Sequence, residues 1–252
     1  MGKPLNQQRR GKGKPPFTAP SHLYYARIMF RTYDDKEKTS VVTGQVIDFV
    51  NDPARSGLLM SIKDEPGKEI NLLAPEGIAL GDTLQFGAQA SVNIGNVLPL
   101  SAIPDGSPIF NLEIVPGDGG KLVRAAGTSA TIVSHAGDKV YVSLPSKKVK
   151  ILDGRCRAQI GIVSVGGRLD RPIFKAGKKF HMMNAKAAYW PKSRGVAMSA
   201  YDHPYGGKQH HSGRSNVVGR SAPPGQKVGL VGAASTGRNK GKKKRAVQEA
   251  TE

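Results

Sequence analysis

Glycine and proline interrupt this chain so often that few long helices can form. The 252 residues include 31 Gly and 17 Pro, and both residue types are unfavourable inside helices. Between them lie short apolar segments bounded by turn residues, a pattern typical of all-β proteins. Only 38% of the residues are hydrophobic and 6% are aromatic, which is thin for one deep core in a chain of this length. The sequence therefore predicts two small all-β domains with long tails.

The first predicted domain covers residues 25–115. Its apolar segments are short and evenly spaced, which favours a small five-stranded barrel of the OB-fold type. Gly44 lies inside one of these segments, where it predicts a bulge or bend that would help the barrel to close. The predicted strand segments are 25–33, 41–50, 57–63, 70–73 and 83–86.

The second predicted domain covers residues 116–190 and reads as a series of hairpins that form an SH3-like barrel. Alternation of apolar and polar residues around a turn at 135–138 places Val140, Val142 and Leu144 inside. A short helix is expected from about Lys179 to Tyr189, and Trp190 is expected to anchor the chain that follows. The predicted strand segments are 128–134, 139–144, 147–151 and 157–165.

Charge is distributed unevenly along the chain. The net charge is +19 with a pI near 10.1, which indicates a polyanionic partner, nucleic acid far more often than a membrane surface. Residues 30–120 nevertheless carry 13 acidic and 6 basic side chains, whereas 121–185 and 186–252 each carry 13 basic and 3 acidic ones. We therefore expect the first domain to face away from phosphate.

Both ends of the chain are basic and poor in apolar residues. The N-terminal arm, residues 1–24, should be disordered alone and should follow an RNA backbone, because its cations alternate with glycine. The C-terminal extension, residues 191–252, likewise combines recurrent Gly with Lys and Arg, so it should fold only on its partner. No run of about 18 apolar residues occurs in the sequence, which excludes a membrane-spanning helix.

Residues 191–207 have the composition of a docking loop. Gly195 frees the backbone next to Arg194, and Pro204 holds it extended after His203. Gly206 and Gly207 allow a bulky partner to approach the main chain closely. Asp202 could orient or charge the His203 ring.

The same loop carries a resemblance to a known family. Residues 194–198 and 201–207, Arg-Gly-Val-Ala-Met and Tyr-Asp-His-Pro-Tyr-Gly-Gly, resemble the signature of the universal ribosomal protein family L-two of the large subunit. Tyr205 replaces a second His of bacterial members, which indicates the archaeal or eukaryotic branch, and Ser199 replaces the usual Asn. Segments 8–13 and 19–22 resemble the archaeal branch. The resemblance implies an OB-fold in the first domain and extends to segments 8–13, 19–22, 52–56, 74–77, 116–120 and 222–225.

Catalytic and metal-binding alternatives are weaker. Adjacent residues of an extended chain point to opposite sides, so Asp202 is poorly placed to orient His203 as in a catalytic triad. His203, His210 and His211 lack the acidic or thiolate support of a metal site, apart from Asp202. Cys156 is the only cysteine, which suits a reducing cytosol. We expect no enzymatic activity, no cofactor and no metal, with Mg²⁺ entering only through rRNA.

The resemblance, together with the excess of positive charge, implies a structural constituent of the large ribosomal subunit in the cytoplasm. Its expected partners are large-subunit rRNA, neighbouring ribosomal proteins and, at the subunit interface, the small subunit. The resemblance implies support of assembly, subunit association, tRNA binding and the RNA-made peptidyl-transferase centre. Two other classes remain open: an enzyme that uses His203, and an OB-fold that binds single strands through residues 25–115 alone. The predicted rRNA-binding residues are Arg9, Arg10, Lys12, Arg155, Arg157, Arg168, Lys175, Lys178, Lys192, Arg194, His203, Tyr205, Gly206, Gly207, Arg214, Arg220, Lys227, Arg238, Lys240, Lys242, Lys243 and Lys244.

Overall fold

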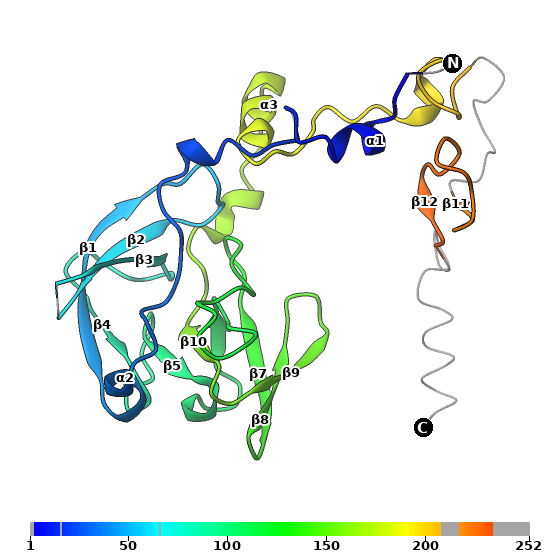
Figure 1. Cartoon of the computed structure of the whole chain (residues 1–252). Helices are drawn as coiled ribbons and strands as arrows, with labels where there is room; N and C mark the ends of the chain where they lie inside the picture. The colour runs from blue at the N-terminus through cyan, green and yellow to red at the C-terminus, as the bar shows by residue number, and fades with distance from the viewer. Residues whose placement is uncertain (1–2, 16, 66, 208–216, 234–252) are drawn as a thin grey trace. The chain divides into compact units, whose positions relative to one another are not determined.

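The computed structural model describes residues 3–15, 17–65, 67–207 and 217–233. The chain divides into two compact units (Figure 1): a larger one of residues 19–186, and a smaller one that combines residues 1–18 with 187–252. Residues 1–18 of the N-terminal arm therefore belong to the same unit as the loop at 191–207.

The larger unit is built on one ten-stranded sheet, in the order β3-β2-β1-β4-β5-β10-β6-β7-β8-β9. All neighbouring strands pair antiparallel except β4 and β5, which are parallel. The strands are β1 (Val42–Val50), β2 (Leu59–Asp64), β3 (Glu69–Leu73), β4 (Thr83–Phe86), β5 (Val97–Pro99), β6 (Pro108–Phe110), β7 (Ala130–Ala136), β8 (Lys139–Ser143), β9 (Val149–Asp153) and β10 (Arg157–Ile160).

Helices are few and short. In the larger unit they are η1 (Ser21–Leu23), α2 (Asp35–Thr39), η2 (Leu100–Ala102), η3 (Gly166–Leu169) and α3 (Ala176–Asn184). The described part of the smaller unit contains α1 (Asn6–Arg10), η4 (Gly195–Ala197) and the paired strands β11 (Val217–Val218) and β12 (Leu230–Val231). The all-β class is confirmed in its coarse form. None of the described helices has the length and apolar run needed to span a bilayer.

The predicted strands in the larger unit are largely confirmed, but β5 and β6 lie where no strand was predicted, and two further expectations differ from the structure. Residues 25–33 contain no strand, although Ile28 and Phe30 are buried. Gly44 does not form the bulge, because the register of β1 shifts between Val46 and Asp48. Glycine is needed at 44 for packing instead, since a Cβ there would lie 2.8 Å from Cγ2 of Ile62.

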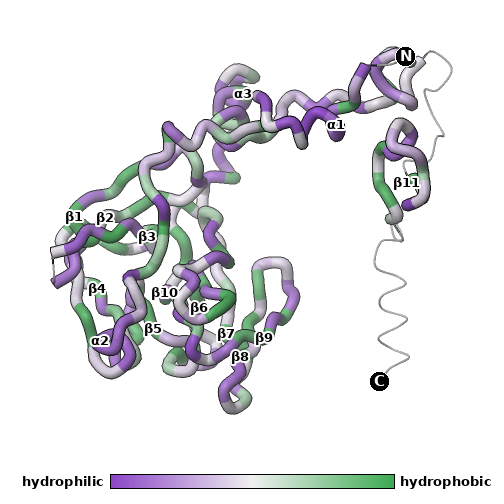
Figure 2. The backbone as a smooth tube through the Cα atoms, in the orientation of Figure 1, coloured by the Kyte–Doolittle hydropathy of each residue, from purple (hydrophilic) through white to green (hydrophobic). Residues whose placement is uncertain are grey.

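The strands enclose two hydrophobic clusters, and Figure 2 shows hydrophobic stretches along the strands that contribute to them. The first cluster gathers side chains of β1–β4, among them Phe86. The second contains Val140 and Val142, as predicted, with Leu144 packed against it. It also takes in Leu98 and Ile109, which precede the predicted boundary at 115/116. That boundary stays a prediction, and among the described residues no strand pair closes the sheet into a barrel.

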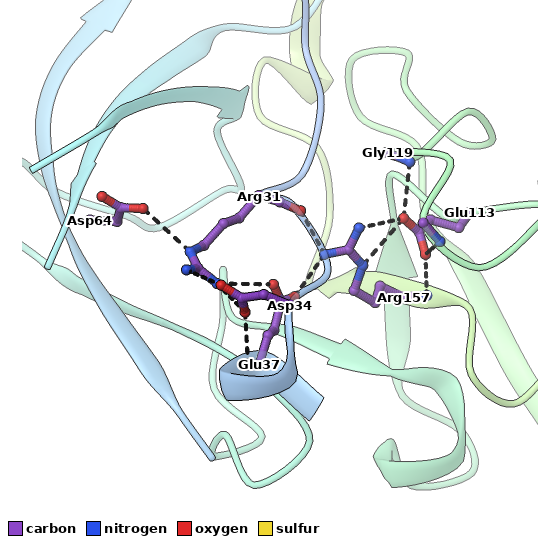
Figure 3. Close-up of polar contacts among 8 residues, drawn as sticks. Arg31, Asp34, Glu37, Asp64, Glu113, Gly119 and Arg157 are labelled. Atoms are coloured by element: carbon purple, nitrogen blue, oxygen red, sulfur yellow. Dashed lines mark hydrogen bonds and ion pairs between the residues drawn. The ribbon is translucent and has the colours of Figure 1, made fainter. Parts of the chain in front are cut away.

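A buried ionic network joins several segments of the larger unit (Figure 3). Arg157 of β10 is 2% exposed and donates to Glu113 at 2.8 Å and to Glu37 of α2 at 2.7 Å. Glu113 also accepts backbone N–H bonds from Gly117 and Gly119. The network therefore holds α2 and the Gly-rich loop 116–120 against β10.

Arg31 extends this network toward β2. Its guanidinium contacts Asp34 at 2.5 Å and Asp64 at 3.4 Å, and it lies 3.7 Å from Glu37. Its carbonyl oxygen accepts a bond from Arg157 at 2.9 Å. Segment 28–34 is thus fixed by charge and burial, which explains how it stays ordered without strand pairing.

Candidate nucleic-acid interface

The N-terminal arm and the docking loop, residues 191–207, contact each other within the smaller unit. Lys3 donates its backbone N–H to the carbonyl of Tyr201, and its Nζ lies 3.1 Å from the carboxylate of Asp202. Leu5 is buried, with 8% of its surface exposed. The arm predicted to be disordered in isolation therefore has a local partner in the same chain.

Gly195 lies directly beneath the ring of His203. A Cβ at this position would come within 2.8 Å of Nε2 and closer still to Nδ1 and Cε1. Glycine is therefore required at 195 for the His203 ring to pack here.

A hydrogen bond to the ring of His203 sets its tautomer. Nδ1 accepts the backbone N–H of Tyr205 at 3.1 Å, which leaves Nε2 to carry the proton of the neutral ring. The Tyr205 ring lies edge-on at a centroid distance of 5.1 Å. Burial lowers the pKa of His203, so the neutral form dominates at pH 7. His203 is thus held as a hydrogen-bond donor through Nε2.

Asp202 bonds to other groups. Its carboxylate accepts from Ser199 Oγ at 3.0 Å and pairs with Lys3. Two hydrogen bonds lower the pKa of Asp202. The bond from Lys3 makes the larger contribution and the bond from Ser199 the smaller. Through these contacts the carboxylate of Asp202 holds the docking loop and the arm together. It does not orient His203 as the acid of a catalytic triad would.

Gly206 closes the docking loop. Its N–H donates to the carbonyl of His203 at 2.9 Å, and a Cβ would overlap the backbone of Ser199. Gly207 has φ of +113° and donates to the carbonyl of Met198. Gly206 is buried, so the structure explains this glycine by packing inside the loop.

Cations surround an open cleft of roughly 510 Å³ between the arm and the docking loop. Its lining includes Arg9, Arg10 and Lys192, all exposed, together with Tyr189 and His203. These three cations were predicted to bind rRNA, but nothing in the sequence indicates that residues 9–10 lie near residue 192. Tyr189 in the cleft lining stacks on Phe17, with the two ring centroids 5.8 Å apart.

The remaining predicted cations of the smaller unit are exposed where the structure describes them. Arg194 flanks Gly195, and Lys12 lies in the arm beyond α1. Arg220 lies over Gly232, where a Cβ would meet its side chain at 2.8 Å, and Lys227 precedes the buried Val228. The residues Arg214, Arg238, Lys240, Lys242, Lys243 and Lys244, and likewise His210 and His211, lie outside the described residues.

One predicted rRNA-binding residue of the larger unit is buried in the structure. Arg157 was predicted to bind rRNA, but it lies inside, where it forms ion pairs with Glu37 and Glu113. Nothing in the local sequence distinguishes Arg157 from the exposed Arg155 two residues earlier. Arg155 stands in the turn before β10, paired with Asp153 at 2.8 Å. The structure leaves Arg168, Lys175 and Lys178 exposed.

Among the described residues, no group of three or more His, Cys, Asp or Glu side chains is arranged to hold a metal ion. Cys156 is buried within the second hydrophobic cluster.

Comparison with known proteins places the chain in a family. Residues 93–228 match the model of the family described as Ribosomal Proteins L2, C-terminal domain. The uL2 protein of the large ribosomal subunit from Methanocaldococcus jannaschii is 49% identical over 239 residues, which cover 94% of this chain and 99% of that protein. The chain belongs to the ribosomal protein L2 family. The resemblance noted in the docking loop is thereby confirmed.

Two further archaeal relatives of the L2 family show the same extent of similarity. The large-subunit uL2 proteins of Methanopyrus kandleri and Methanococcus vannielii are 49% and 48% identical over 239 residues each. These alignments cover 94% of this chain and 98% and 100% of the two relatives. The similarity therefore spans both compact units.

Sequence reasoning missed Lys3 as a member of the docking-loop assembly. Its partner, Asp202, lies at the other end of the chain, and a lone lysine in a basic arm carries no signal for such a contact. Gly195 was predicted to give the backbone conformational freedom. In the structure glycine is required there because a side chain would occupy the space of the His203 ring.

Proposed function

We propose that this L2-family chain is a structural constituent of the large ribosomal subunit that binds large-subunit rRNA. The observation that carries the proposal is the arm and docking-loop assembly, in which exposed cations line a cleft beside a neutral His203. Cations supply phosphate contacts, and a donor and aromatic rings can address unstacked bases. The relatives are large ribosomal subunit proteins, which supports the same assignment.

The finer parts of this function extend the proposal. The larger unit would act as a scaffold of two small barrels, of OB and SH3-like type, each around one hydrophobic cluster. The chain would support subunit assembly, subunit association, tRNA binding and the RNA-made peptidyl-transferase centre. Its partners would be rRNA, neighbouring ribosomal proteins and the small subunit, at the cytoplasmic ribosome, with Mg²⁺ bound by the RNA.

Binding to an archaeal large-subunit rRNA transcript across a salt series tests the proposal. The triple variant Arg9→Ala, Arg10→Ala, Lys192→Ala removes three charges from the cleft. If each cation neutralises one phosphate, the slope of log affinity against log salt falls by about 2 to 3. The matched control replaces three exposed cations of the acidic region, which is residues 30–120. These cations are Lys36, Lys63 and Lys68.

The two variants separate the open alternatives. Equal slopes for both variants and the unchanged chain would refute RNA binding at the cleft. A greater effect of the control variant would move binding to the acidic region and favour a single-strand-binding OB-fold. Hydrolytic activity of the purified chain that disappears with His203→Ala would favour the enzyme class instead.

A further inference from the structure

Residues 168–178, which run from the end of η3 to the first turn of α3, form an exposed segment rich in both apolar and basic side chains. Phe174 is 89% exposed and Leu169 is 80% exposed, and Ile173 between them is 47% exposed. Single exposed apolar residues are common on protein surfaces. A ring left almost wholly in water next to two other exposed apolar side chains instead marks a contact surface.

Charge on this segment identifies the class of partner. Arg168, Arg171, Lys175 and Lys178 are exposed around Phe174, and Asp170 is the only carboxylate between residues 168 and 178. Four cations against one anion match a polyanion better than the surface of an average protein. An aromatic ring set among cations is the arrangement by which proteins stack on unpaired bases while they hold the adjoining phosphates.

The segment is anchored at both ends, so the ring is presented from a defined position. Val163 is fully buried just before it, and Gly127 touches Gly166, since a Cβ at 127 would lie 2.5 Å from the Gly166 Cα. Val165 adopts a left-handed φ of +64° and turns the chain into η3. At the other end Lys175 occupies the N-cap position of α3, and its backbone carbonyl accepts the N–H of Lys179. Phe174 is thus held immediately before a helix.

We propose that Phe174 stacks on an unpaired base of large-subunit rRNA, while Arg171 and Lys175 contact phosphates on either side of that base. The inference rests on the proposed function, because it takes rRNA as the ligand. It adds a second RNA contact, located in the larger unit and based on an aromatic ring. The cleft of the smaller unit relies mainly on its cations.

Phe174→Ala and Phe174→Tyr in the full chain test this contact on the same rRNA transcript and over the same salt series. Loss of one stacked base is expected to weaken binding roughly 5- to 150-fold. Because Phe174→Ala removes no charge, its salt slope should match that of the unchanged chain. Phe174→Tyr keeps the ring and should bind like the unchanged chain.

Two further variants calibrate the result. Lys175→Ala should lower the salt slope by about 0.7 to 0.9, the value for one lost phosphate contact. Leu80→Ala removes a side chain that is 59% exposed in the acidic region and should leave affinity and slope unchanged. Since all three positions are exposed, thermal melting curves should coincide for every variant.

Three outcomes would count against stacking. If Phe174→Ala keeps full affinity, the ring serves a partner other than RNA, such as a neighbouring protein, and the inference is wrong. If it weakens binding with a shallower slope, the ring acts only by arranging the cations, which also overturns stacking. If the unchanged chain itself fails to bind the transcript, the proposed function falls first. The wild-type control therefore separates the two failures.

Discussion

Replacement of Arg157 by methionine would remove the cation at the centre of the buried network and leave two carboxylates in the interior. The guanidinium donates two hydrogen bonds to Glu113, one to Glu37 and one to the carbonyl of Arg31. It also lies 4.8 Å from the ring centroid of Tyr33. Methionine fills much of the volume but satisfies none of these acceptors.

Removal of Arg157 leaves Glu37 with fewer partners than Glu113, so most of the lost stability comes from Glu37. Glu113 keeps the backbone N–H groups of Gly117, Gly119 and residue 157. Glu37 is fully buried and keeps only the more distant Arg31, at 3.7 Å. Removal of one partner from a buried pair costs about 3–5 kcal/mol. At roughly 2–4 °C per kcal/mol, the midpoint of thermal unfolding should fall by about 6–20 °C.

The pH dependence identifies the cause. Burial raises the pKa of Glu37 above its usual range, and Arg157 opposes this shift. Without Arg157 the pKa rises further, so the folded variant binds a proton more readily than the unfolded chain does. A raised carboxyl pKa favours folding below the unfolded value, about 4.3, and this advantage is lost as pH rises through the folded value. The deficit of Arg157→Met should therefore be largest at pH 7 and shrink toward pH 4.5.

Urea unfolding of the full chain at both pH values measures this deficit. Arg155→Ala is the control, because the side chain of Arg155 is 77% exposed and water screens its pair with Asp153. Its unfolding midpoint should stay close to that of the unchanged chain. A free energy of unfolding for Arg157→Met within about 1 kcal/mol of the unchanged chain at pH 7 would refute the reasoning.

Two further predictions concern a glycine and the cysteine. Gly195→Ala should displace the His203 ring and weaken binding to the rRNA transcript, whereas Leu80→Ala, at an exposed position outside both proposed RNA contacts, should bind normally; an affinity of Gly195→Ala equal to that of the unchanged chain would contradict the packing role of Gly195. Burial raises the pKa of Cys156 to about 11, so the folded chain should resist iodoacetamide at pH 8 and react once unfolded in urea. Mass spectrometry measures this, and fast alkylation of the folded chain would contradict the buried position.

Local pattern was sufficient for most strands and for the docking loop. Strand β4 occupies the predicted residues 83–86, and the hairpin of β7 and β8 turns where the sequence places it. Alternation at period two depends only on neighbouring residues, so it can be read without knowledge of the fold. The motif at 191–207 likewise carried the family, because its residue types are specific in order and spacing.

The buried charges could not be predicted from the sequence. Arg155 and Arg157 look alike in the chain, yet one is solvated and the other is enclosed by Glu37 and Glu113. Burial of a charge depends on partners that are distant in sequence, here 120 and 44 residues away. Residues 25–33 were predicted as a strand for the same reason, since nothing local reveals that Arg31 ties this segment to acidic groups.

The sequence by itself determined the class of the fold, the excess of positive charge and its segregation, and the loop that identifies the L2 family. These properties are sums over residues or patterns among neighbours. Only the tertiary structure decided that Lys3 meets Asp202, that Gly195 makes room for His203, and that Arg157 lies inside. Each of these depends on which distant segments come into contact, and so on the free energy of packing the whole chain.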